Sequence, residues 1–163
     1  MTNDFDRFGD LLDYPVYVVT AAADGDLAGC LVGFASQCSI DPPRFVVWLS
    51  VANRTYRVAL RCEHLAVHVL DAAGHGLAAL FGGRSGDLVD KFEHVAWDPR
   101  GAEGTPVLRE AAGWFVGRVR GHCPGGDHVG FLLDVVDVGP AAGSRGGLLA
   151  FSDVDDVRAG HPA

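Results

Sequence analysis

Three short segments carry residue types and spacings that could do chemistry. The first runs from Gly29 to Pro43 and reads GCLVGFASQCSIDPP, so that glycines interrupt an extended apolar stretch and small polar side chains follow. Glycine inside a strand indicates that something lies close against the backbone. The segment could therefore hold a flat ligand, although a bulged strand without a ligand explains the same residues.

The second segment, SVANRTYR at positions 50–57, follows an expected strand and opens an expected helix. The first turn of a helix offers unpaired N–H groups and the positive end of a dipole, which suits a phosphate. Arg54 and Arg57 add positive charge, and Ser50 and Thr55 add hydroxyl groups. The segment is a candidate anion site in an otherwise acidic chain, and a capped helix with solvated arginines fits it equally well.

The third segment pairs a histidine with an acid in the sequence GGDH at 125–128, where a glycine turn precedes a strand. Histidine changes its charge near neutral pH more readily than any other side chain. His128 beside Asp127 is therefore a candidate proton donor or phosphate contact. His64 and His68 share one face of an expected strand, but no third ligand accompanies them, and we expect no metal site.

The elements that must position these segments are mostly strands. Runs of β-branched and aromatic residues predict six strands, over 14–22, 27–37, 44–49, 65–70, 114–122 and 128–138. Asn53 is a suitable N-cap for a helix over 53–62, further short helices are expected near 4–12 and 74–81, and Asp24-Gly25 predicts a tight hairpin. Six closely spaced strands with two or three short helices favour a mainly β, antiparallel barrel over a parallel sheet.

Size and composition limit the class of protein further. The 163 residues predict one domain, with a core over about 13–151 and a flexible tail over 152–163. Apolar residues make up 48% and charged residues 21%, which excludes wholesale disorder. The net charge of −8 argues against a nucleic-acid partner, and no stretch is long and apolar enough to predict a membrane span.

The cysteines and the first residues indicate a compartment. The N-terminal segment is acidic and shows no signal peptide. The four cysteines match no zinc-site spacing, so we expect reduced thiols in a cytoplasmic protein. Near-continuous apolar strands indicate that the outer face of the barrel is also covered, as by a second subunit, and a homodimer is expected.

In combination, these motifs resemble those of the flavin reductase-like, FMN-binding split-barrel family. The matching pieces, in chain order, are VVTA at 18–21, the segment 29–43 ending in SIDPP, NRT at 53–55, LAVHVL at 65–70, DKF at 90–92, PVL at 106–108 and GDH at 126–128. The resemblance covers about residues 13–151. It implies a six-stranded, antiparallel Greek-key split barrel that dimerises and holds a flavin in a groove near the dimer interface.

The resemblance also implies a role for individual residues. The flavin ring of FMN, or of FAD, would lie along Leu31, Val32, Gly33, Phe34 and Ser36. The ribityl phosphate would meet Ser50, Val51, Ala52, Arg54 and Thr55, with Phe81 and Gly82 also approaching the flavin. Asp127 and His128 would lie on the NAD(P)H side, with His128 as the candidate catalytic residue. Many family members carry Thr-Ala-Asn-Ser where this chain has LVGF, so ring contacts here would come from backbone groups and apolar packing.

The implied activity is hydride transfer from NAD(P)H to flavin, followed by delivery of reduced flavin to a partner such as a monooxygenase. In such enzymes the cofactor carries the chemistry and the protein positions it. The alternative is a split barrel without reductase activity that binds FMN, haem or a deazaflavin coenzyme. His68, His122 or His128 could then ligate haem iron.

Overall fold

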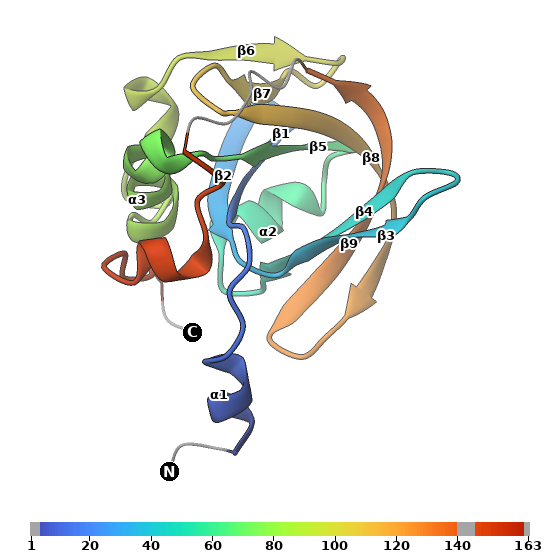
Figure 1. Ribbon diagram of the computed structural model, residues 1–163. Coiled ribbons are helices and arrows are strands. Elements are labelled where there is room, and N and C mark those ends of the chain that lie inside the picture. Colours follow the sequence, from blue (N-terminus) through green and yellow to red (C-terminus); the bar gives the residue numbers. More distant parts are fainter. Residues whose placement is uncertain (1–3, 140–145, 162–163) are drawn as a thin grey trace.

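A strongly curled antiparallel sheet dominates the computed structural model, which describes residues 4–139 and 146–161 (Figure 1). Within those residues, seven strands run in the order β2-β1-β5-β8-β9-β4-β3, and β6 and β7 form a separate pair. The strands are β1 (Tyr17–Ala23), β2 (Asp26–Val32), β3 (Ala35–Ser39), β4 (Arg44–Ser50), β5 (His64–Val69), β6 (Trp97–Arg100), β7 (Thr105–Leu108), β8 (Gly113–Pro124) and β9 (His128–Val138). The helices are α1 (Asp4–Gly9), α2 (Arg54–Ala59) and α3 (His75–Gly83), with 3-10 turns at Ala72–Gly74, Lys91–His94 and Phe151–Val154. No helix in the described ranges is both long and apolar enough to cross a membrane.

The mainly β architecture with short helices is confirmed, but the prediction of six strands is wrong. The stretch expected as one strand over 27–37 breaks at Gly33 and Phe34 into β2 and β3. These two strands form the opposite edges of the seven-stranded sheet, so the chain passes from one edge to the other at the break.

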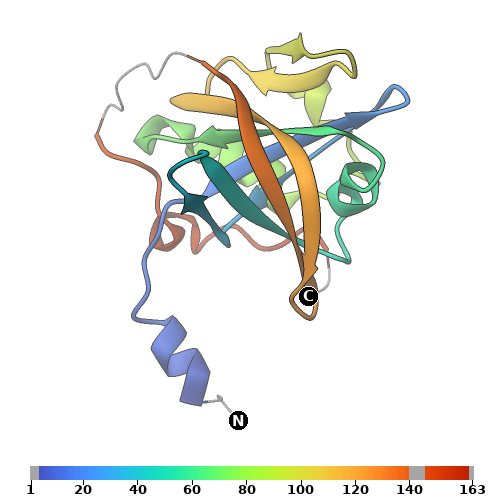
Figure 2. The same ribbon diagram turned by 90° about the vertical axis from the view of Figure 1, so that its right-hand side faces the viewer.

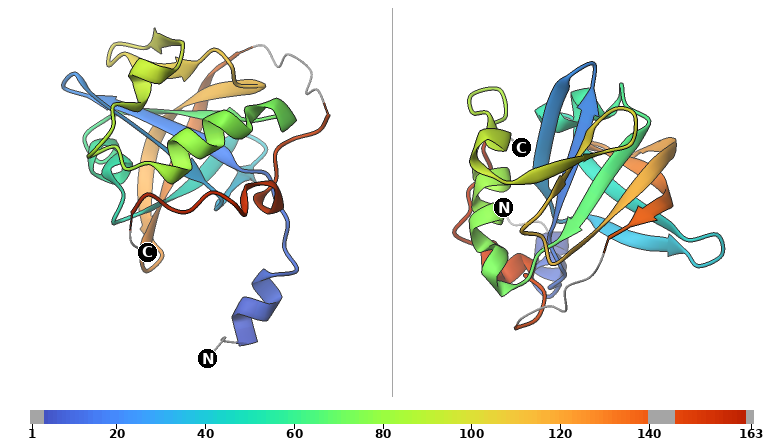
Figure 3. Two further views of the ribbon diagram at one scale, coloured as in Figure 1. Left: turned by 90° about the vertical axis from the view of Figure 1, so that its left-hand side faces the viewer. Right: turned by 90° about the horizontal axis from the view of Figure 1, so that it is seen from above.

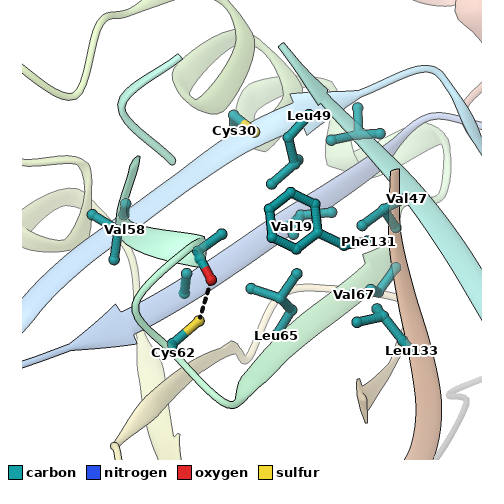
Figure 4. Close-up of a cluster of buried hydrophobic side chains, with 14 of the residues drawn as sticks. Val19, Cys30, Val47, Leu49, Val58, Cys62, Leu65, Val67, Phe131 and Leu133 are labelled. Atoms are coloured by element: carbon teal, nitrogen blue, oxygen red, sulfur yellow. Dashed lines mark hydrogen bonds between the residues drawn. The ribbon is translucent and has the colours of Figure 1, made fainter. Parts of the chain in front are cut away.

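Apolar side chains along β1 alternate between two cores, one on each face of the strand. Val19 packs inside the curled sheet with Leu65 and Phe131 (Figure 4). Val18 packs on the outer face with Phe81, in a cluster beneath α3. Both faces of β1 are thus covered by this chain itself, and the near-continuous apolar sequence of this strand needs no second subunit to explain it.

The turns in the structure test several of the local predictions made from the sequence. The Asp24-Gly25 prediction is confirmed, because both residues have positive φ, 54° and 78°, and join β1 to β2 as a hairpin. The long hairpin of β8 and β9 (Figure 2) turns at the predicted 125–128 segment. The pair β6-β7 was not predicted. Each of its strands contains a proline, Pro99 or Pro106, which cannot donate a backbone hydrogen bond and weakens the sequence signal for a strand.

The segment after residue 150 differs from the expected flexible tail. Its 3-10 turn buries Val154 in the cluster beneath α3, and Val157 packs against the same cluster. Figure 3, left, shows this segment in red running alongside α3 in green. The sequence SDVDDVRAGH is polar apart from two valines three residues apart, and so its pattern predicts no element.

Candidate functional site

Two adjoining cavities lie near the break between β2 and β3. The inner cavity, of about 380 Å³, lies between β2, the end of α3 and the C-terminal segment. The outer cavity, of about 280 Å³, lies between the break, β4 and the β8–β9 turn. Leu31, Gly33, Asn53 and Phe151 line both, so the two cavities adjoin, and we refer to them together as the split groove. The inner cavity alone is within the range of about 300–1,000 Å³ found for small-molecule sites.

Most residues that the resemblance placed along a ring border this groove. Leu31 and Gly33 line both cavities, and Val32 and Phe34 line the outer one. Ser36 is exposed on β3 and lines neither cavity. The backbone N–H groups of Gly33 and Phe34 have no hydrogen-bond partner in the described part of the chain. The break therefore offers free backbone donors beside apolar side chains.

A buried lysine fixes the end of α3 against β2. Lys91 is only 4% exposed, and its ammonium group donates to the carbonyl oxygens of Gly29 and Phe81 at 2.9 Å each. Burial lowers the pKa of Lys91. A Cβ at Gly29 would lie 2.7 Å from the Phe81 ring, so this strand glycine admits a ring of the same chain rather than a ligand. Lys91 was part of the DKF motif but no role was predicted for it, although its contact with the Phe81 carbonyl oxygen fixes the end of α3 that lines the inner cavity.

The predicted anion site at the start of α2 is largely satisfied by the chain itself. The Asn53 side chain caps the helix by accepting the Thr55 N–H at 3.0 Å, and the Ala52 N–H donates to the Ser50 hydroxyl at 3.3 Å. Ser50 lines the outer cavity and Ala52 the inner one. Val51 is exposed outside both cavities, and Thr55 is buried behind them. Few backbone donors at this helix start remain for a ligand.

Arg54 lines the inner cavity, but its guanidinium group is already engaged. One nitrogen donates to the Leu27 carbonyl oxygen at 2.6 Å, another pairs with the Asp26 carboxylate, and Nε lies 3.6 Å from Asp87. Arg57 also pairs with Asp87, at 2.8 Å. These acidic partners stand about 30 positions away in the chain, and so the sequence pattern gave no sign of them.

Arg84 presents a free guanidinium group at the same end of the groove, and the sequence analysis missed it. It is exposed directly after α3 and lines the inner cavity with Ser85 and Gly86. Arg84 has no ion-pair partner in the described residues, and the Ser85 and Gly86 N–H groups donate to no described acceptor. In the sequence, the only indication of this cationic loop was the tripeptide RSG at the end of a helix. This loop combines one free cation with free backbone donors, which is the chemistry that binds a phosphate.

Asp127 and His128 line the outer cavity. The His128 Nδ1 atom lies 2.7 Å from the Asp127 carboxylate, and this hydrogen bond lowers the pKa of Asp127. The imidazole ring packs edge-on against Phe34, with centroids 5.3 Å apart. A Cβ at Gly130 would lie 3.1 Å from the Trp48 indole, so glycine in β9 lets Trp48 pack beside the turn that carries His128. With Nδ1 directed at the carboxylate, Nε2 is left to meet a ligand.

His68 and His64, both in β5, have structural partners. His68 is fully buried, and its Nδ1–H donates to the Val18 carbonyl oxygen at 2.9 Å while Nε2 accepts the Leu108 N–H at 3.0 Å. Burial lowers the pKa of His68 to about 4. His64 lies 3.5 Å from the Glu103 carboxylate. Because both ring nitrogens of His68 are used, this residue is not available as a haem ligand.

Known protein families and curated proteins include relatives of this chain. The family described as "Flavin reductase like domain" matches residues 9–157. The chain is 32% identical over 143 residues to the NADH-dependent FMN reductase AsuE2 of Streptomyces nodosus subsp. asukaensis, covering 86% of this chain and 77% of that protein. It is 29% identical over 129 residues to the reductase component of 4-nitrophenol 4-monooxygenase/4-nitrocatechol 2-monooxygenase of Rhodococcus opacus, covering 79% and 67%.

Other relatives are longer than this chain. It is 31% identical over 115 residues to the stachydrine N-demethylase reductase subunit Stc3 of Rhizobium meliloti (strain 1021), covering 68% of this chain but 48% of that protein. The chain thus spans about half the length of this curated relative. Among solved structures, a flavin reductase domain protein of Arthrobacter sp. FB24 superposes with a TM-score of 0.80 at 22% identity, covering 92% and 90% of the two chains. That likeness concerns the fold.

Proposed function

Because the chain belongs to the flavin reductase-like family, we propose that it is a flavin reductase that transfers hydride from NAD(P)H to FMN, with FAD as a second flavin candidate. One observation carries this proposal. The split groove joins an apolar slot with free backbone donors at Gly33 and Phe34 to a free cation at Arg84. FMN has the matching parts, namely a flat ring with a hydrogen-bonding edge and a phosphate.

In this proposal the ring borders the break and the phosphate lies at the α3 end. Leu31 and Val32 supply apolar contact, while the N–H groups of Gly33 and Phe34 donate to the polar edge of the ring. The residues that surround the phosphate end are Ala52, Arg54, Phe81, Gly82, Arg84, Ser85 and Gly86. Arg54 mainly forms part of the cavity wall at the phosphate end, because its guanidinium group is already paired with Asp26. Ser36, Val51 and Thr55 line neither cavity and have no direct contact with flavin in this proposal.

A bound flavin supplies the redox chemistry, accepting a hydride and passing electrons on. The protein positions the flavin and the nicotinamide relative to each other. Ser50, Asp127 and His128 line the outer cavity, where the nicotinamide end of NAD(P)H would enter. Asp127 holds the imidazole through Nδ1, so that Nε2 of His128 orients the nicotinamide or holds a proton beside it. Phe34 restricts the other side of the imidazole ring.

We propose that the curled sheet is the Greek-key split barrel of this family, forming one domain that assembles as a homodimer. Helix α1 projects away from the barrel (Figure 1) and leaves Phe5 69% and Phe8 54% exposed. Side chains of this size gain stability when they are buried, and a second copy would bury them. Light scattering across a dilution series tests this, since a monomer at all concentrations would contradict it.

A partner monooxygenase would receive the reduced flavin. Support comes from the relative named as the reductase component of a monooxygenase. We place this activity in the cytoplasm, and the four cysteines, which are unpaired in the structure, are in the state that a reducing compartment maintains. A two-component assay in which a monooxygenase turns over only when this protein and NADH are present tests the partnership.

Ligand titration tests the proposed function directly. The purified protein should quench or shift FMN fluorescence as the groove fills, and bound flavin should show the absorption bands of an oxidised flavin. A non-reductase barrel would instead give a haem Soret band or bind a deazaflavin in preference to FMN. Absence of FMN binding would overturn the proposal.

A further inference from the structure

The C-terminal strap, which we define as residues 154–161, lines the split groove along its length. It starts beneath α3, where Val154 is buried and Val157 packs on the same cluster. Figure 3, left, shows the red segment passing along the green helix α3 towards the C-terminal end. At its far end, the ring Nε2 of His161 lies 3.4 Å from the Asn53 side-chain nitrogen. The strap thus spans from the end of α3 to the N-cap of α2.

A glycine contact fixes the strap in the middle of this path. The Gly160 N–H donates to the Gly82 carbonyl oxygen at 3.0 Å. A Cβ at Gly160 would lie 2.6 Å from the Arg84 carbonyl carbon and 2.7 Å from the Ser85 nitrogen, both of which are backbone atoms that cannot move aside alone. On the opposite side, a Cβ at Gly82 would meet the Val157 side chain at 3.1 Å. The strap packs this closely because Gly160 in the strap and Gly82 in α3 both lack a side chain.

The strap borders the groove without filling it. Val157, Ala159 and His161 line the inner cavity, and its volume of about 380 Å³ remains with the strap in place. Ala159 and His161 also line the outer cavity. The strap therefore forms one wall of the groove, which extends from the proposed phosphate end to the proposed ring end. A ligand that fills both cavities would lie against this segment.

We propose that the C-terminal strap is the outer wall of the flavin site and that its release at Gly160 controls how fast flavin enters and leaves. The proposal rests on the proposed function, since it takes flavin as the occupant of the groove. The strap is held by the Gly160–Gly82 backbone hydrogen bond, the pairing of Asp156 with His75 at 2.9 Å, the contact of His161 with Asn53, and two valines. A segment with so few contacts opens at a lower cost than the barrel unfolds. Gly160 is accordingly a positioning residue, which acts on flavin through the strap.

The matched variants are Gly160→Ala and Gly76→Ala. A Cβ at Gly76, in α3, meets no atom within 4 Å, so its replacement leaves the strap alone and favours the helix. Stopped-flow dilution of the FMN complex measures the dissociation rate from the return of free-flavin fluorescence. We expect Gly160→Ala to release FMN about tenfold or more faster than the wild type, and Gly76→Ala to stay within about twofold. Thermal unfolding without flavin should be similar in both variants.

Trypsin gives a second measurement that does not depend on turnover. Arg158 is exposed within the strap, and cleavage after it requires the strap to leave the groove. Saturation with FMN should slow this cleavage in the wild type, and Gly160→Ala should be cut faster with or without FMN.

Two results would contradict the proposal that the strap is the outer wall of the flavin site and controls flavin exchange. Unchanged FMN release in Gly160→Ala would show that the strap does not limit exchange, and tighter FMN binding would show that the strap competes with flavin. In both cases the wild type still binds FMN, so the proposed function stands. A wild-type protein that binds no FMN would contradict both the proposed function and the proposed role of the strap.

Discussion

Replacement of Arg84 by methionine tests how the groove holds a phosphate. Arg84 lines the inner cavity and makes no ion pair in the described residues, so its removal breaks no contact that stabilises the fold. A hydrogen bond to a charged group contributes about 1.5–3 kcal/mol, which is a factor of about 10–100 in Kd. Because Arg84 is exposed, solvent screens the interaction. We therefore expect the lower limit, about tenfold weaker FMN binding.

The comparison of two ligands and two arginines makes this test specific. Riboflavin has the ring of FMN without its phosphate, so Arg84→Met should leave riboflavin affinity unchanged. Arg57→Met is the matched control, because Arg57 is also exposed and near this end of the groove but pairs with Asp87 and lines neither cavity. Fluorescence titration at low ionic strength gives all the dissociation constants. An equal loss for FMN and riboflavin, or an equal loss in both variants, would refute the assignment.

Three further predictions follow from other residues. His128→Ala should slow reduction of bound flavin by NADH in single-turnover stopped flow while sparing FMN affinity, and an unchanged rate would make His128 structural. His68 has its pKa lowered to about 4 from 6.5, so the unfolded chain gains a proton first as pH falls. Urea unfolding should therefore show a loss of roughly 3 kcal/mol between about pH 6.5 and pH 4, and His68→Gln should abolish that part of the slope; identical slopes would contradict this. Lys91→Met leaves the Gly29 and Phe81 carbonyl oxygens without their ammonium donor and should lower the free energy of unfolding by about 2 kcal/mol, so an unchanged urea midpoint would show that the lysine contacts stabilise nothing.

Local patterns predicted much of the fold because the relevant physics acts over a few residues. The Asp24-Gly25 turn, the Asn53 cap and the strands around 14–22 and 128–138 all appear close to their expected positions. The 27–37 stretch was wrong as one strand, because the distinction between a bulge and a change of sheet edge depends on distant partners. Phe34 illustrates this, since its carbonyl oxygen accepts a hydrogen bond from Trp48 in β4.

The candidate site was harder to predict, because charge pairing is a tertiary property. Arg54 looked like a free cation in the sequence, but Asp26 approaches it from the β1–β2 hairpin. Arg84 had no helix start to mark it, and within residues 4–139 and 146–161 no acid folds against it. The strap was not predicted for a related reason. The requirement for glycine at position 160 comes only from its close contact with Gly82 and the Arg84 backbone, which the tertiary structure brings together.

Anaerobic mixing of the FMN complex with NADH shows whether the protein reduces flavin. We expect the oxidised-flavin absorption band to bleach in a rapid phase whose rate saturates with NADH concentration. A protein that binds FMN tightly but leaves the band unbleached by NADH and by NADPH would contradict the reductase function.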